Sequence, residues 1–140
     1  MISKDVFIGI LMSCSPHVGY QKGGKYVETF WLLPVQGRAE IFDAFAKHHG
    51  FRFGTPVKYN KGTDLMVEYI RIQNRKTLNA LLKMIPPCLI EANQRVKAFC
   101  KVMEIINSKR HLTQEGRDEI DLLKGKMWKW RGEKYGNNSS

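Results

Sequence analysis

Apolar residues recur along this chain with two different periods, which predict helices in some stretches and strands in others. Almost every residue of Asp5–Cys14 is apolar, and this is typical of a helix buried on most sides, with Ser3 as its N-cap. Further helices are predicted, from apolar residues at helical spacing, at Arg38–His49, Lys76–Met84, Ile90–Asn107 and Leu112–Leu123. Asn74 can cap the helix Lys76–Met84. Gly50 stands where the helix Arg38–His49 is expected to end, and Gly125 where the last helix is expected to end.

Two other stretches are rich in β-branched and aromatic residues and lie beside turns that contain glycine. Tyr26–Val35 follows the turn Gly19–Lys25, and the pair Val57–Asn60 and Leu65–Gln73 flanks the turn Lys61–Asp64. Each stretch predicts a β-hairpin. The order helix, two strands, helix, two strands and helices predicts an α+β fold, in which helices cover one face of an antiparallel sheet and leave the other free.

Length and cysteine content indicate one domain in a reducing environment. A chain of 140 residues can bury one core without disulfides, so residues 1–125 are expected to form one domain, followed by a basic aromatic tail, 126–140, that is partly disordered. Cys14, Cys88 and Cys100 lack paired metal-ligand spacing, which favours the cytoplasm, a nucleoid, an organelle or a virus over secretion. No apolar run is long enough to span a membrane, so a membrane partner is not expected.

The charge balance adds a partner to this picture. Lys and Arg number 23 against 13 Asp and Glu, which gives a formal net charge of +10. Such an excess favours a polyanion, with nucleic acid first. Basicity that serves only solubility, or contact with anionic lipid, stays open at this point.

Residues in the first and last predicted helices resemble one protein family. Lys97–Ile106, His111–Gly116 and Ile120–Lys124 are similar to the C-terminal helices of the LAGLIDADG homing endonucleases, and Phe7–Ser15 aligns without gaps with their nine-residue motif. The resemblance is to the class with a single motif copy. It implies an αββαββα core with an antiparallel sheet and extra C-terminal helices over almost the whole chain.

The alignment departs from the motif at its acidic positions. Met12 and Cys14 stand where the family has acidic residues, and Ser15 replaces the second glycine. The resemblance implies that an acid at the position of Cys14 would bind the divalent metal that activates water. Because a thiol is a soft ligand and Mg²⁺ a hard cation, no catalytic residue, metal ligand or cofactor is expected.

The resemblance also implies a homodimer formed through the first helix. Gly9 and Ser13 would allow close approach of two backbones, and Phe7 and Ile10 would supply apolar contact. A helix buried inside a monomer is the alternative.

In this family the free sheet face contacts DNA, and alternation in the last strand identifies residues on that face. Met66, Ile70 and Ile72 suit the core, so Tyr69, Arg71 and Gln73 point the other way; Arg and Gln can read guanine and adenine edges. The expected nucleic-acid-binding residues are Gln21, Lys22, Lys25, Thr29, Lys58, Lys61, Tyr69, Arg71, Gln73, Arg75, Lys76, Lys129 and Arg131. The lysines at the second hairpin, with Arg75 and Lys76, are expected at phosphates, and the two cations of the tail lie among tryptophans that could stack on bases.

These observations predict a homodimer that has a homing-endonuclease scaffold and derives from a mobile genetic element. It is expected to bind double-stranded DNA, with or without sequence preference, and not to cleave it. Two alternatives stay open. One is an active, Mg²⁺-dependent homing endonuclease that recruits its metal through another carboxylate, and the other is an RNA-binding intron maturase or splicing factor.

Overall fold

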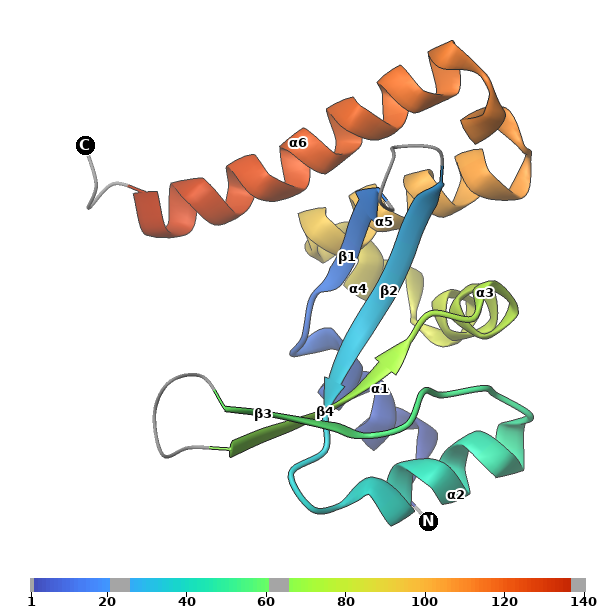
Figure 1. The fold of residues 1–140 in the computed structure, drawn as a ribbon, viewed down its shortest axis with the longest axis vertical. Helices are drawn as coiled ribbons and strands as arrows, with labels where there is room; N and C mark the ends of the chain where they lie inside the picture. Colours follow the sequence, from blue (N-terminus) through green and yellow to red (C-terminus); the bar gives the residue numbers. More distant parts are fainter. Residues whose placement is uncertain (1, 21–25, 61–65, 137–140) are drawn as a thin grey trace. The chain divides into compact units, whose positions relative to one another are not determined.

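The structure is a computed structural model that describes residues 2–20, 26–60 and 66–136. Its elements follow in the order α1 (Lys4–Met12), β1 (Pro16–Tyr20), β2 (Val27–Pro34), α2 (Ala39–His49), β3 (Val57–Asn60), β4 (Met66–Ile72), α3 (Arg75–Met84), α4 (Pro87–Ala92), α5 (Gln94–Asn107), the 3₁₀ turn η1 (Arg110–Leu112) and α6 (Gln114–Gly136), as Figure 1 shows. The predicted α+β class and the predicted order of helices and strands are confirmed.

Polar side chains and one glycine fix the helix ends where the sequence places them. The Ser3 hydroxyl accepts a hydrogen bond from the Val6 N–H at 3.2 Å, as an N-cap does. Asn74 does the same at the start of α3 by accepting from the Thr77 N–H at 3.0 Å. Gly50 ends α2 at φ 69°, a left-handed conformation that glycine adopts without steric cost.

Several boundaries differ from those expected, and the largest differences lie in the C-terminal helices. The single helix predicted over 90–107 is divided at Asn93, whose backbone is extended and whose side chain accepts from the Val96 N–H at 3.0 Å, so that α5 begins anew. The last helix continues beyond the expected boundary after residue 125 as far as Gly136. Met127 extends the buried side of this helix and is only 6% exposed, so part of the expected tail belongs to the packed structure, while 137–140 lie outside the described residues.

The chain divides into two compact units. The first consists of Met1–His17 and Glu28–Met84, and the second of Val18–Val27 and Ile85–Ser140. Each is described by itself below.

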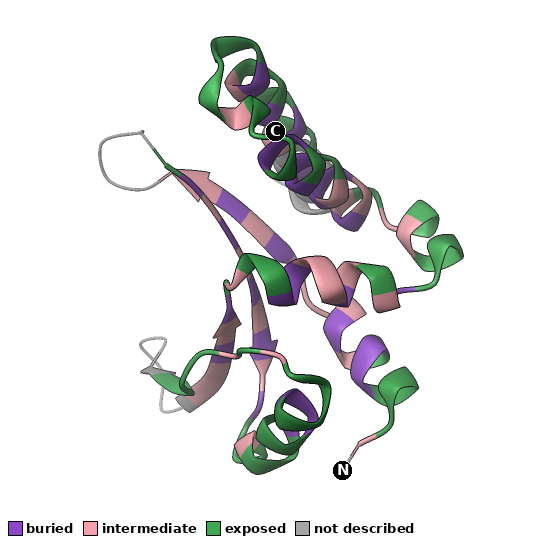
Figure 2. Ribbon diagram, turned by 90° about the vertical axis from the view of Figure 1, so that its right-hand side faces the viewer, coloured by how far each residue is buried: buried purple, intermediate pink, exposed green. Residues whose placement is uncertain are grey.

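The core of the first unit lies between helices and one face of the strands. In the described residues the strands form one sheet in the order β1-β2-β4-β3, with β4 antiparallel to both β2 and β3. Trp31 and Leu33 of β2 lie opposite Ile72 and Ile70 of β4, and all four are buried. Helices α1 and α3 lie on the same side of the strands in Figure 2, and both contain buried residues (purple). The Trp31 indole N–H donates to the Leu11 carbonyl at 3.1 Å and thereby ties α1 to β2.

The second unit is built around α5 and α6, which pack against each other and against η1. The buried side of α5 includes Val102 and Met103, and that of α6 includes Ile120 and Leu123. A Cβ atom at Gly116 would lie 1.8 Å from the Arg110 carbonyl oxygen, so only glycine allows α6 to pass this close to η1.

Candidate nucleic-acid interface

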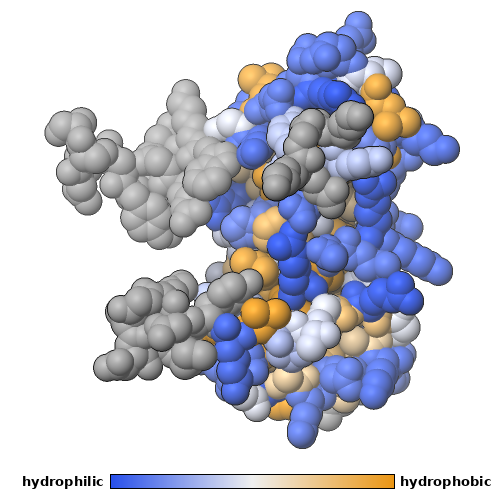
Figure 3. Space-filling model, viewed as in Figure 1, coloured by the Kyte–Doolittle hydropathy of each residue, from blue (hydrophilic) through white to orange (hydrophobic). Residues whose placement is uncertain are grey.

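The sheet face turned away from the helices carries a mixed set of side chains. Along β2, burial alternates strictly: Val27, Thr29, Trp31 and Leu33 are buried, and the residues between them are half-buried. The register places Leu32 beside Arg71, and Pro34 beside Tyr69. We call this surface the free face; its described residues are His17, Glu28, Phe30, Leu32, Pro34, Val57, Val67, Tyr69, Arg71 and Gln73. Figure 3 looks onto it and shows hydrophobic and hydrophilic residues side by side.

A row of stacked planar groups crosses the centre of the free face. The His17 imidazole of β1 and the Phe30 ring of β2 are stacked, with centroids 5.0 Å apart and an interplanar angle of 11°. The Arg71 guanidinium of β4 lies over the same Phe30 ring, with Cζ 3.8 Å from its centroid, which is a cation–π contact. Three strands thus contribute one planar side chain each to a single stack.

Glu28 completes this cluster. Its carboxylate accepts a charge-assisted hydrogen bond from Arg71 Nη2, and the two side chains are 31% and 39% exposed. Among the described residues of the free face these two are the only Asp, Glu, Lys or Arg side chains, so that part of the face carries little net charge. Positive charge must therefore come from residues around it.

Two such residues directly follow the free face in the chain. Arg75 and Lys76 occupy the first turn of α3, are both exposed, and lie just beyond Gln73 and the cap Asn74. Cations at a helix N-terminus oppose the helix dipole and gain nothing from it, whereas a phosphate there is favoured by the dipole and by free backbone N–H groups. This end of β4 therefore combines base-edge donors with groups suited to phosphate.

Other expected binding residues have different positions. The position of Thr29 is corrected: it is 5% exposed and belongs to the core-facing row of β2, because Trp31 fixes the alternation of that strand. Lys58 is exposed but pairs in register with Glu68, so it lies on the face opposite to Tyr69 and Arg71. Lys129 and Arg131 fall within α6, and the structure describes their backbone alone. Four expected residues lie outside the described ranges: Gln21, Lys22, Lys25 and Lys61.

Of the four residues expected at an interface between two copies, Gly9, Ile10 and Ser13 lie on the outward side of α1, whereas Phe7 does not. Phe7 is fully buried: its ring stacks on Phe45 at 4.2 Å between centroids and meets Phe42 edge-on at 6.2 Å. Its assignment to an interface between copies is therefore corrected to a core role. The outward stripe of α1 consists of Val6, Gly9, Ile10 and Ser13; Val6 is 54% exposed, and a Cβ at Gly9 would meet nothing within 4 Å.

The end of α1, where the motif has its acids, holds a thiol in place of a carboxylate. Cys14 Sγ donates to the Ile10 carbonyl at 3.2 Å, and burial raises the pKa of this thiol, so it is neutral at physiological pH. No group of three or more His, Cys, Asp or Glu side chains that could hold a metal exists in the part of the chain that the structure describes. The donor set at this position does not fit Mg²⁺, which requires oxygen ligands.

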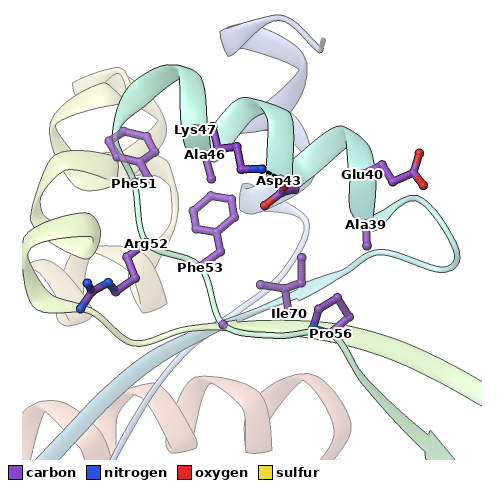
Figure 4. Close-up of a pocket in the computed structure, with 11 residues that line it drawn as sticks. Ala39, Glu40, Asp43, Ala46, Lys47, Phe51, Arg52, Phe53, Pro56 and Ile70 are labelled. Atoms are coloured by element: carbon purple, nitrogen blue, oxygen red, sulfur yellow. Dashed lines mark ion pairs between the residues drawn. The ribbon is translucent and has the colours of Figure 1, made fainter.

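A pocket of about 510 Å³ lies in the first unit between α2 and the segment that leads to β3. Figure 4 shows the Phe53 ring inside it, with Ile70 below and the Asp43–Lys47 ion pair of 3.0 Å at its rim. Glu40 adds a second carboxylate to this rim. Arg52 also lines the pocket, so its two carboxylates are balanced by two cations, and its apolar floor offers no excess of positive charge for a phosphate.

The sequence placed Arg71 and Gln73 on the free face but did not place there the three other residues of the cluster. His17 was missed because no residues were assigned to the strand before the turn Gly19–Lys25. Glu28 and Phe30 were not assigned to the face because Phe30–Leu33 is continuously apolar and gives no alternation of its own. The signal that finds them is Trp31: once its large side chain is placed in the core, period-2 alternation puts Phe30 and Glu28 on the free face.

Comparisons with known proteins agree with this geometry at the level of the fold. The LAGLIDADG homing endonuclease I-GzeII, solved in complex with a DNA target, matches with a TM-score of 0.62 and 21% identity over 89% of this chain and 43% of its own. The meganuclease I-SmaMI, bound to uncleavable DNA, gives a TM-score of 0.64 and 19% identity over 89% of this chain and 44% of its own. The archaeal intron-encoded homing endonuclease I-Vdi141I, complexed with DNA, gives 0.62 and 16% over 90% of this chain and 82% of its own.

The fold of this chain is therefore that of the LAGLIDADG homing endonucleases, as the sequence resemblance implied. The chain spans less than half the length of I-GzeII and I-SmaMI, and most of I-Vdi141I. No protein-family model matches the sequence, and no curated protein does. In the described residues, no helix is both long and apolar enough to cross a membrane.

Proposed function

We propose that this chain binds double-stranded DNA through the free face and does not cleave it. The observation that carries the proposal is the continuous run from Arg71 to Lys76, which places base-edge donors on a free sheet face and cations at the adjacent helix start. Three structural neighbours that share the fold, I-GzeII, I-SmaMI and I-Vdi141I, were solved with DNA bound. A major groove accommodates a two-stranded β-ribbon, and β2 and β4 are antiparallel neighbours at the centre of the sheet.

The stack on the free face supports duplex DNA over single-stranded nucleic acid. A protein that binds unpaired bases needs aromatic faces open for stacking. Here the face of Phe30 is covered by the Arg71 guanidinium, and the His17 ring is stacked with it. What these groups offer to a ligand is their edges, and edges are what a duplex reads by hydrogen bonding.

We further propose that two copies of the motif helix meet in the DNA-binding assembly. Gly9 lies on the outward stripe of α1. The methyl group of an alanine there would meet no other atom of the same chain within 4 Å, and alanine would stabilise the helix by about 1 kcal/mol relative to glycine. Packing within one chain therefore does not require a glycine at this position. Close approach of the α1 backbone of a second copy would require it, with Val6 and Ile10 as apolar neighbours. A symmetric pair would bind a palindromic or nearly palindromic site.

The absence of cleavage follows, in this proposal, from Met12 and Cys14. Hydrolysis of a phosphodiester by Mg²⁺ needs a carboxylate that anchors the metal beside the scissile bond. A half-buried, neutral thiol at this point supplies no such anchor.

The test combines binding and nicking in one preparation. Purified protein is titrated against a labelled duplex from low to high salt, and is also incubated with supercoiled plasmid and Mg²⁺ or Mn²⁺. We expect duplex binding whose affinity falls steeply with salt, because phosphate contacts release counterions, and no nicking. Nicking that EDTA abolishes would refute the non-cleaving part. Absence of duplex binding at low salt, or a clear preference for structured RNA, would refute the DNA-binding part.

A further inference from the structure

The Glu28–Arg71 pair combines a negative and a positive group at the centre of a surface proposed to bind a polyanion. A carboxylate there repels phosphate, so contact with the backbone of DNA does not explain it. Folding alone gains little from the pair, because water still reaches and screens this half-buried ion pair, and Arg71 Nε is buried without a hydrogen-bond partner among the described residues. A role in recognition accounts for both features.

The geometry limits how Arg71 can move. Its guanidinium is held from below by the Phe30 ring at 3.8 Å and from the side by the Glu28 carboxylate. A guanidinium has five N–H donors, so the hydrogen bond to Glu28 leaves others for a ligand. Likewise a carboxylate has two oxygens and accepts more than one hydrogen bond. With 39% and 31% of their side chains exposed, both groups can be reached by a base edge.

We propose that Glu28 is a specificity-determining residue of the free face, which together with Arg71 selects a G·C base pair. In the major groove, guanine presents two adjacent acceptors, N7 and O6, and its partner cytosine presents the N4 donor beside them. A donor fork next to a carboxylate acceptor complements this order. An A·T pair separates its acceptors with a donor, so the fork finds only one of them. This inference rests on the proposed duplex binding and adds the base pair that the central cluster selects.

Glu28 has a second effect in this arrangement. Without the carboxylate, Arg71 can turn from the base edges to a phosphate, which raises affinity for every sequence alike. Loss of Glu28 should therefore lower the preference for one sequence and raise the affinity for DNA of any sequence. We expect a salt dependence that steepens by about one phosphate contact.

The experiment compares wild type with Glu28→Gln on a set of duplexes selected from a randomised pool. The matched control is Asp43→Asn, which also removes one negative charge from an ion pair of the first unit, between Asp43 and Lys47 on α2. Wild type and the control should prefer G·C at one position of each half-site by about tenfold, the discrimination typical of one well-placed contact. Glu28→Gln should lose most of this preference and bind unrelated sequences at least as well as wild type does.

A second variant distinguishes the effect of how Arg71 is positioned from the effect of charge. Phe30→Leu keeps every charge but removes the ring under the guanidinium, so preference should fall several-fold while affinity for unrelated DNA stays within about twofold. Thermal unfolding of all variants checks that they fold. If Glu28→Gln keeps the preference of wild type, or if the lost preference is for A·T, the inference is overturned while duplex binding stands. If wild type binds no duplex at low salt, the proposed function and this inference fall together.

Discussion

Replacement of Phe7 by alanine tests whether this residue packs in the core of one chain or at an interface between two copies of the chain. The Phe7 ring is fully buried and contacts Phe45 at 4.2 Å, Phe53 at 5.9 Å and Phe42 at 6.2 Å between ring centroids. Truncation of such a ring removes its burial and leaves a cavity, which costs about 3–5 kcal/mol of the free energy of unfolding. The rings around it limit collapse of this cavity, so we expect a loss near the upper end of the range.

Urea unfolding followed by circular dichroism measures this effect. For a domain of this size the urea slope is about 2 kcal/mol per molar, so the midpoint should fall by roughly 2 M. Phe7→Leu should lose less, and Ile10→Ala, on the outward stripe of α1, should cost under about 1 kcal/mol in dilute protein. Each variant is measured at two protein concentrations, because an interface between copies makes the midpoint depend on concentration.

The core assignment predicts that the Phe7→Ala loss is the same at both concentrations. A loss below about 1 kcal/mol, or one that appears only at high protein concentration, would place Phe7 between copies and refute the reasoning.

Three further predictions concern the second unit and use the same unfolding assay. Gly116→Ala should lower stability by about 3 kcal/mol or more because its Cβ would overlap the Arg110 carbonyl, whereas Gly125→Ala, with open space around it, should raise stability by about 0.5–1 kcal/mol; equal effects would contradict the close contact. Asn93→Ala should cost about 1 kcal/mol as a lost N-cap, and no loss would show that the break between α4 and α5 does not depend on the cap. Burial, and then the hydrogen bond to Asp121, raise the pKa of Tyr20 to about 12 from an ordinary 10.0, so its contribution is complete below pH 10 and is lost as pH rises through 12. The stability difference between wild type and Tyr20→Phe should shrink over that interval, and a constant difference would contradict the assignment.

The sequence predicted the elements well where local chemistry decides them. Ser3, Asn74 and Gly50 end their helices as expected, because capping depends on the residue itself and a few neighbours. Where tertiary packing decides, the pattern was ambiguous. Helix α1 is apolar on all sides, so its sequence cannot tell the stripe of Phe7 from that of Ile10; only the aromatic residues of α2 and the following segment do so.

The same limit explains the outcome at the candidate interface. In β4 alternation is clear and placed Arg71 correctly opposite the core residues Ile70 and Ile72. In β2 the apolar run hides it, so Thr29 was expected at the wrong face and Glu28 was not expected at the interface. The partners of Arg71 come from β1 and β2, which lie more than 40 residues earlier in the chain, and no local pattern could join them.

Recognition and hydrolysis occupy different parts of this fold, and that separation makes a non-cleaving binder physically reasonable. In the proposed function the base-reading groups lie on strands β2 and β4, whereas Met12 and Cys14, which align with the acidic positions of the motif, lie at the end of α1. A carboxylate at Cys14 would place a charge at a half-buried position, where burial already raises the pKa of the thiol, and partial desolvation of that charge would cost stability. A neutral thiol removes that cost and leaves Arg71, Glu28 and Phe30 unchanged. In the proposed function, the thiol at this position therefore favours stability of the fold, while loss of Glu28 would change what the free face selects.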